Sequence, residues 1–263
     1  MDLQLANKTA LVTGSTAGIG YAIAEELARE GATVIVNGRT RARVESAVQM
    51  IRVATRRQAL ELAADMGTVE GTELAIQRFP HVDILVNNLG IFEPKAFEQI
   101  PDSDWFHIFE VNVLSGVRLS RHYLPRMKAN GWGRIVFVSS ESGVQIPAEM
   151  IHYGLTKTAE LALARGLAET TAGTGVTVNS VLPGPTESEG VSDFVDSLAK
   201  SQGTGRATVE KEFFETMRPT SLLKRFAKPK EVAAMVAFVC SPLSSATNGA
   251  ALRVDGGVVR SIL

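Results

Sequence analysis

The first forty residues contain an order of elements that few folds accommodate. An apolar run from Thr9 to Thr13 precedes a glycine-rich turn, and an amphipathic helix from Tyr21 to Glu30 follows that turn. A second apolar run spans Thr33 to Asn37. Strand, glycine turn, helix and strand form the first half of a dinucleotide-binding unit. Glycines let the backbone approach a pyrophosphate closely, and the helix N-terminus offers free N–H groups and a positive dipole end. The glycines are Gly14, Gly18 and Gly20.

A second constrained stretch lies between Arg134 and Lys157. The apolar run Ile135 to Val138 predicts a strand that ends at Ser139-Ser140, and Tyr153 and Lys157 begin an apolar helix. Residues four apart share one face of a helix, so the phenol and the ammonium point the same way. The end of the preceding strand can bring the Ser140 hydroxyl to the same point.

This grouping suits proton transfer at a carbonyl or alcohol oxygen. A free tyrosine titrates near ~10, and a neighbouring lysine lowers that pKa toward the range of efficient general acid–base catalysis. The Ser140 hydroxyl can hold the substrate oxygen beside Tyr153. Because Tyr-x-x-x-Lys occurs by chance in many helices, the other half of the reaction must come from the rest of the chain.

Composition excludes several other classes of protein. The chain has 263 residues and a net charge of −1, which gives no electrostatic reason to expect nucleic acid or an acidic membrane surface. A single cysteine, Cys240, excludes an internal disulfide framework and fits a reducing compartment. No apolar run is long enough for a membrane span, and the N-terminus lacks a signal-peptide layout. We therefore expect a cytoplasmic protein with one domain, residues 1–263.

Six motifs occur in the order and spacing of the short-chain dehydrogenase/reductase family, which this chain resembles over essentially its whole length. They are Thr13-Gly14-x-x-x-Gly18-Ile19-Gly20, Asn87-Asn88-Leu89-Gly90, Asn112, Ser140, Tyr153-x-x-x-Lys157 and Pro183-Gly184. Within the family the chain looks most similar to the 3-oxoacyl-(acyl carrier protein) reductase-like group. The resemblance implies a doubly wound parallel sheet of seven strands in three α/β/α layers. Leu89 departs from the alanine usual at its position.

The resemblance also implies roles for individual residues. Asn112, Ser140, Tyr153 and Lys157 would be catalytic. Asn112 would distort its helix and hold a water that links Lys157 to solvent; a hydrogen-bonded core amide is the alternative. Asp65 would contact the adenine, although it could instead cap the following helix. The cofactor-binding residues would be Gly14, Ser15, Thr16, Gly18, Ile19, Gly20, Arg39, Asp65, Met66, Asn88, Gly90, Tyr153, Lys157, Pro183, Gly184 and Thr186.

The end of the second strand favours NADP(H) over NAD(H). A preference for NAD normally needs a carboxylate there, and this chain has Gly38 followed by Arg39. Arg39 offers a planar fork that can bind a 2′-phosphate, unless it is only a solvated surface charge. Hydroxyl groups of Ser15 or Thr16 and of Thr40 could add donors.

The segment from about 185 to 219 lies between a strand end and the helix from Pro229 to Cys240, and we expect it to form a mobile lid over the substrate. Its apolar residues may serve only to pack it down. The residues expected to shape the pocket besides the lid are Phe92, Phe97, Glu141, Gln145 and Glu149. None of them identifies the substrate.

The sequence therefore predicts an oxidoreductase that moves a hydride between NADP(H) and a ketone or secondary alcohol. The alternative is a dinucleotide-binding regulatory or scaffold protein without turnover, which would be expected to lack Ser140, Tyr153 or Lys157; all three are present. We expect a homotetramer, because apolar helices at Trp105 to Leu119 and Ile151 to Leu167 need cover on more than one side.

Overall fold

A computed structural model describes the backbone of residues 1–262 and the side chains of all but residues 189, 190, 193, 194, 198 and 202 of that range. Seven strands of this range form one sheet in which every neighbouring pair is parallel. The order is β3-β2-β1-β4-β5-β6-β7, so the chain starts in the middle and winds outward in both directions. The strands are β1 (Thr9–Val12), β2 (Thr33–Gly38), β3 (Ala59–Ala63), β4 (Ile84–Asn87), β5 (Gly133–Val138), β6 (Val176–Pro183) and β7 (Ala251–Val254).

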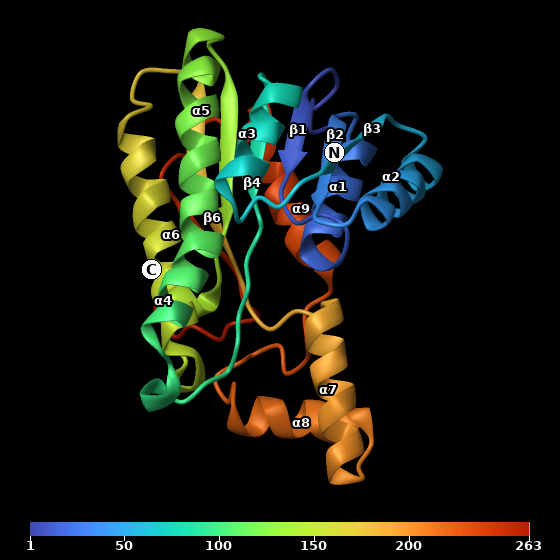
Figure 1. Cartoon of the computed structure of the whole chain (residues 1–263), viewed down its shortest axis with the longest axis vertical. Coiled ribbons are helices and arrows are strands. Elements are labelled where there is room, and N and C mark those ends of the chain that lie inside the picture. The colour runs from blue at the N-terminus through green and yellow to red at the C-terminus, as the bar shows by residue number, and fades with distance from the viewer. Residues whose placement is uncertain (263) are drawn as a thin grey trace.

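Helices cover both faces of the sheet, which gives the predicted three layers (Figure 1). On one face lie α1 (Gly18–Arg29), α2 (Arg41–Thr55) and α9 (Pro229–Cys240), whose apolar sides meet β1 and β2 in one core cluster. On the other lie α3 (Val69–Arg78), α5 (Ser115–Ala129) and α6 (Ile151–Glu169), with a second cluster around Leu85 and Phe137. Cys240 is buried in the first cluster. Strands buried on both faces explain the nearly continuous apolar runs in the sequence.

The predicted lid contains two helices, α7 (Glu189–Gln202) and α8 (Arg206–Thr216). They lie beyond one end of the sheet, away from both helical layers (Figure 1). Val195, Val209, Phe214 and Phe226 form a small core of their own. The segment therefore contains two regular helices with a shared apolar core, so its apolar residues do pack it down.

The helix α4 (Asp102–Phe109) has Pro101 at its N-cap position, and no side chain caps it. The alternative role of Asp65 as the cap of the following helix is wrong. Thr68 caps α3, because its hydroxyl accepts the Gly71 N–H at 3.0 Å.

A π-helical stretch, Glu110–Leu114, connects α4 to α5, and Asn112 lies at its centre. This confirms the predicted helix distortion. Within the described residues, no helix combines the length and apolar character that crossing a membrane requires.

Candidate active site

Two cavities open at the carboxyl ends of the strands, where ligands bind in doubly wound sheets. The larger has a volume of about 290 Å³ and lies between the ends of β4, β5 and β6 and the lid helices. The smaller, of about 180 Å³, lies between the glycine turn and the ends of β2 and β3. Their shared border is the loop after β4, because Asn88 and Gly90 line the larger cavity and Leu89 the smaller.

The glycine turn is packed too closely for a side chain at Gly20. A Cβ atom on Gly20 would lie 2.3 Å from the Gly14 carbonyl oxygen and 2.5 Å from Asn88 Nδ2. That amide donates to the carbonyl oxygens of Thr13 and Gly14, at 2.9 and 3.1 Å. Asn88 therefore ties the end of β4 to the turn. No side chain caps α1, so the N–H groups of its first turn remain available to an anion.

One predicted donor is not accessible. Ser15 is fully buried; its hydroxyl donates to the Val12 carbonyl oxygen at 2.7 Å and accepts the Asn37 N–H at 2.9 Å. The first bond ties the turn to the end of β1, and the second ties it to β2. The prediction that Ser15 could offer a hydroxyl to a phosphate is therefore wrong, because the backbone already uses that hydroxyl, whereas Thr16 lines the smaller cavity.

The smaller cavity brings basic groups to the end of β2. Arg39 is exposed and lines this cavity together with Thr40 and Arg43. A Cβ atom on Gly38 would lie 2.6 Å from Thr16 Cγ2, so any side chain at this position would require Thr16 to move. Arg43 was not predicted as part of this site, although its place one turn into a helix that starts beside Arg39 could have indicated it.

The remaining lining of the smaller cavity includes Asp65 and Met66, as predicted. The Asp65 carboxylate accepts the Gly67 N–H at 3.0 Å and so shapes the turn after β3.

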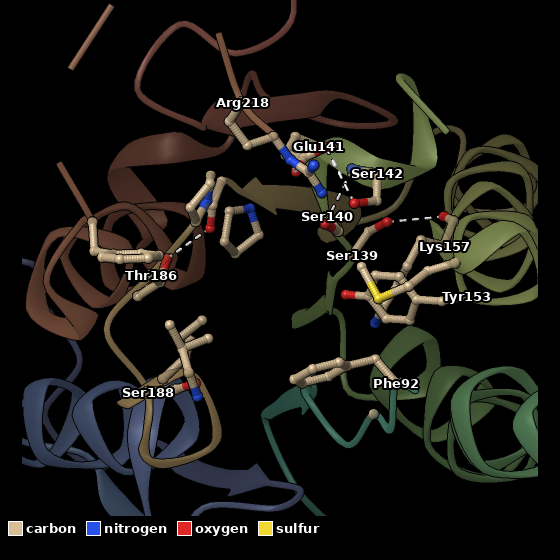
Figure 2. Close-up of a pocket in the computed structure, with 18 of the residues that line it drawn as sticks. Phe92, Ser139, Ser140, Glu141, Ser142, Tyr153, Lys157, Thr186, Ser188 and Arg218 are labelled. Atoms are coloured by element: carbon tan, nitrogen blue, oxygen red, sulfur yellow. Dashed lines mark hydrogen bonds and ion pairs between the residues drawn. The ribbon is translucent and has the colours of Figure 1, made fainter. Parts of the chain in front are cut away.

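Ser140, Tyr153 and Lys157 line the larger cavity together, as the helical spacing predicted (Figure 2). The start of α6 packs backbone against the turn Glu141–Gly143, because a Cβ atom on Gly143 would lie 2.9 Å from the Lys157 carbonyl carbon. The Ser140 hydroxyl accepts the Ser142 N–H at 3.1 Å, which leaves its own proton available to a ligand. The Lys157 ammonium lies 5.7 Å from the centre of the Tyr153 ring.

Five influences set the pKa of Tyr153. Burial raises the pKa of the phenol above its ordinary value, while the Lys157 ammonium and the Ser140 hydroxyl act to lower it and Glu160 and Glu141 act to raise it. In this structure burial outweighs Lys157. The predicted lowering by Lys157 is thus present but not dominant.

The closest partner of Lys157 was missed. Its ammonium lies 3.0 and 3.1 Å from the two carboxylate oxygens of Glu160 and 3.1 Å from the Val138 carbonyl oxygen. Both side chains are almost completely buried. Burial raises the pKa of Glu160 to about 7 against the opposing effect of Lys157. Burial acts to lower the pKa of Lys157, but Glu160 and Tyr153 outweigh it, so that pKa is raised.

Asn112 lies behind the larger cavity and satisfies every polar atom of its amide. Its Nδ2 donates to the Ile91 carbonyl oxygen and to Thr156 Oγ1, both at 3.0 Å, and its Oδ1 accepts the Ile91 N–H at 2.8 Å. The amide therefore joins the π-helical stretch to the loop after β4 and to α6. Both alternatives from the sequence describe part of this arrangement, a distorted helix and a hydrogen-bonded core amide.

A buried cluster of charges forms one wall of the larger cavity. Arg218, which follows α8, donates from Nε to Glu141 and from Nη1 to Glu149, each at 3.1 Å. Burial raises the pKa of Glu141, while Arg218 and the Ser142 hydroxyl act to lower it. Arg218 was not predicted, because its partner Glu141 is 77 residues away and no spacing connects them.

Of the five residues predicted to shape the pocket, three line it: Phe92, Glu141 and Glu149. Phe97 and Gln145 do not; Phe97 is exposed and its ring contacts Trp105 instead. The other predicted cofactor residues that line the larger cavity are Ile19, Asn88, Gly90, Pro183, Gly184 and Thr186. Gly18 is not among the lining residues, although its N–H belongs to the first turn of α1.

The site fits a nicotinamide dinucleotide. The uncapped start of α1 and the tight glycine turn provide a cradle for a pyrophosphate, and one cavity lies on each side of that cradle. The smaller cavity would suit the adenosine half, and the larger would take the other half, beside Tyr153. This fold and this arrangement define a dinucleotide-binding oxidoreductase of the doubly wound α/β class.

Comparisons with known proteins support the assignment to this class. The family model of the short chain dehydrogenases matches residues 8–198, and the chain belongs to the short-chain dehydrogenase/reductase family. YvaG of Bacillus subtilis (strain 168), an uncharacterized oxidoreductase, is 50% identical over 100% of both chains. D-beta-hydroxybutyrate dehydrogenase of Cupriavidus necator is 35% identical, covering 97% of this chain and 99% of that protein. The crystal structure of L-sorbose reductase from Gluconobacter frateurii, complexed with NADPH and L-sorbose, has a TM-score of 0.94 and 31% identity over 100% of both chains.

The predicted subgroup receives less support. A 3-oxoacyl-[acyl-carrier-protein] reductase is among the relatives, but it is not more similar than the hydroxybutyrate dehydrogenase. The family therefore establishes a hydride-transferring oxidoreductase that uses NAD(P), and its relatives act on chemically different small molecules.

Proposed function

We propose that this protein is an NADP(H)-dependent oxidoreductase that interconverts a ketone and a secondary alcohol. The observation that carries the proposal is the convergence of Ser140, Tyr153 and Lys157 on a single cavity beside the glycine turn. In the reducing direction the bound dinucleotide supplies the hydride that forms the new C–H bond at the carbonyl carbon. The carbonyl π bond is lost as its oxygen takes a proton from the protein.

The protein's own groups handle that proton. Tyr153 donates it from its phenol, and the Ser140 hydroxyl donates a hydrogen bond that holds the substrate oxygen beside the phenol. Lys157 stabilises the resulting phenolate and binds the cofactor ribose. Asn112 supports the relay through which Lys157 exchanges protons with solvent. In the oxidising direction Tyr153 accepts the proton of the alcohol.

The cofactor residues divide between the two cavities. Gly14, Thr16, Gly18 and Gly20 would bind the pyrophosphate, and Asp65 and Met66 the adenine side. The nicotinamide half would contact Ile19, Asn88, Gly90, Pro183, Gly184 and Thr186. A preference for NADP(H) is supported by Arg39 and Arg43 in the smaller cavity, by glycine in place of an acidic residue at position 38, and by the NADPH complex of L-sorbose reductase.

The protein would act as a homotetramer. Apolar side chains on its outer helices support this proposal, since Phe106 of α4 is 75% exposed and Leu155 of α6 is 46% exposed. The family resemblance points to the same assembly. Light scattering at micromolar concentration would detect it, and a monomer would refute it. The lid role of residues 185–219 and a cytoplasmic location remain predictions.

The test of the function is NADPH oxidation with a panel of ketones, followed at 340 nm. We expect turnover that depends on both ketone and NADPH. A protein that binds NADPH tightly yet reduces no ketone and oxidises no secondary alcohol would instead be the non-catalytic dinucleotide-binding protein.

A further inference from the structure

The wall of the larger cavity made by Arg218, Glu141 and Glu149 carries an unequal number of charges. One guanidinium faces two carboxylates, at 3.1 Å from each. Arg218 and Glu141 are buried, with residue exposures of 8% and 4%. Figure 2 shows Arg218 pointing toward Glu141 beside Ser142 and Ser140, and therefore close to the reacting end of the cavity. With both carboxylates ionised this cluster has a charge of −1.

The other charged residue of the cavity wall does not compensate for this excess. The Lys157 ammonium is already paired with the carboxyl group of Glu160 at 3.0 Å. Among the described residues that line the cavity, both cations therefore have carboxylate partners. A carboxylate or phosphate group on a substrate would find no spare cation on this wall and would meet the excess negative charge of Glu149.

Glu149 is the accessible member of the cluster. Its side chain is 34% exposed, whereas those of Glu141 and Arg218 are 5% and 10% exposed. The Glu141 carboxylate is already occupied by Arg218 and by the Ser142 hydroxyl, at 3.2 Å. A hydroxyl of a neutral substrate can donate a hydrogen bond to Glu149. Apolar side chains also line this cavity, namely those of Phe92, Met150, Phe213, Met217 and Phe226.

We propose that this cavity accepts neutral ketones and discriminates against ketoacids, and that Glu149 provides the discrimination. The proposal rests on the function proposed above and specifies its substrate class. An anionic group beside a partly buried cluster with a net charge of −1 is disfavoured by about tenfold or more in kcat/KM. The established family does not decide this point, because its members include enzymes named for an acid and for a sugar.

The matched probes are acetoacetate and methyl acetoacetate, which present the same reacting ketone and differ by one charge. We expect kcat/KM with NADPH to be at least about tenfold higher for the ester. A second pair, 4-acetylbenzoate and its methyl ester, separates charge from size, since both pairs should show the same preference. The discrimination should appear mainly in KM, because the charge lies away from the reacting carbon.

The variant Glu149→Gln removes the negative charge, and its carboxamide still offers one oxygen as a hydrogen-bond acceptor. We expect the ratio of kcat/KM for acetoacetate to that for the ester to rise about threefold to tenfold. The matched control is Glu169→Gln, because Glu169 is an exposed carboxylate at the far end of α6, outside the cavity. It should leave the ratio as in the wild type.

Three results would overturn the proposal. Equal or faster reduction of acetoacetate would show that the cavity tolerates the anion, and the proposed hydride transfer would stand. An unchanged ratio in Glu149→Gln would show that Glu149 does not discriminate. No reduction of any neutral ketone in an NADPH-binding protein would remove the proposed function and this inference together.

Discussion

The two halves of the active-site edge are built from different interactions. At the ends of β1 and β2, the glycine turn is held by backbone contacts and by uncharged groups such as Ser15 and Asn88. At the ends of β5 and β6, the wall is held by buried ion pairs, Lys157 with Glu160 and Arg218 with Glu141. The first half depends on shape and the second on charge. The effects of substitutions in the first half should therefore not depend on pH, whereas the effects of substitutions in the second half should depend on it.

The largest expected effect is the loss of activity when the proton donor of the second half, Tyr153, is replaced. Tyr153→Phe should lower kcat by about a thousandfold, within the range for loss of a general acid. NADPH should still bind with nearly unchanged Kd, measured by fluorescence, because only the transferable proton is removed. Turnover close to that of the wild type would contradict the role of Tyr153.

The control for that substitution is Tyr123→Phe on α5. The Tyr123 hydroxyl donates to the Phe79 carbonyl oxygen at 2.8 Å, far from the cavity lining. We expect it to lower the free energy of unfolding by about 1 kcal/mol and to leave kcat unchanged.

In the first half, the largest effect should follow from Gly20→Ala. The new methyl group would lie 2.3 Å from the Gly14 carbonyl oxygen, and backbone cannot move aside as a flexible side chain can. We expect NADPH binding to weaken at least about tenfold and stability to fall by about 1–3 kcal/mol, as for overpacking. Fluorescence titration and thermal unfolding measure both.

Gly166→Ala is its matched control. Gly166 lies on the exposed side of α6, and a Cβ atom there would meet nothing within 4 Å. Alanine should raise stability by about 0.5–1 kcal/mol, because glycine is a poor helix former. Similar losses in both variants would mean that the glycine turn is not the restricted element.

A smaller effect on cofactor binding is expected from a substitution at Arg39, which lines the smaller cavity. Arg39→Ala should weaken NADPH binding about tenfold and leave NADH binding nearly unchanged, because a charge-assisted bond to the 2′-phosphate is lost. Arg41→Ala is the control, since Arg41 is 83% exposed, pairs with Glu45 and does not line the smaller cavity. An equal loss for both cofactors would show that Arg39 does not contact the phosphate.

The sequence predicted the locally encoded residues of both halves better than the long-range ion pairs, for a physical reason. Glycine spacing and helix periodicity are local, so the positions of Gly20, Tyr153 and Lys157 followed from residues close to them in the chain. The Arg218–Glu141 pair joins segments 77 residues apart and leaves no local pattern. Glu160 could have been found, because it follows Lys157 by three residues on a predicted buried helix. Ser15 was misassigned because a hydroxyl next to a glycine gives no sign of whether the backbone already uses it.

The last prediction concerns the coupling of Glu160 to Tyr153 through charge. Alcohol oxidation needs the Tyr153 phenolate, so its rate rises with pH through the Tyr153 pKa. Lys157 and Ser140 lower that pKa, while Glu160 and Glu141 raise it. Glu160→Gln removes one raising charge and should shift the rise toward lower pH by about one unit or less. The profile of kcat/KM for oxidation with NADP⁺ measures the shift.

The effect should have a defined pH window. Because the pKa of Glu160 is about 7, wild type and variant carry the same charge at this position well below pH 7, and their behaviour should diverge above it. A carboxyl whose folded pKa is raised contributes stability that is lost as pH rises through that pKa. The variant should therefore lose less unfolding free energy than the wild type between pH 5 and pH 8. A profile shifted by the same amount in Glu169→Gln, or no divergence above pH 7, would show that Glu160 only fills space beside Lys157.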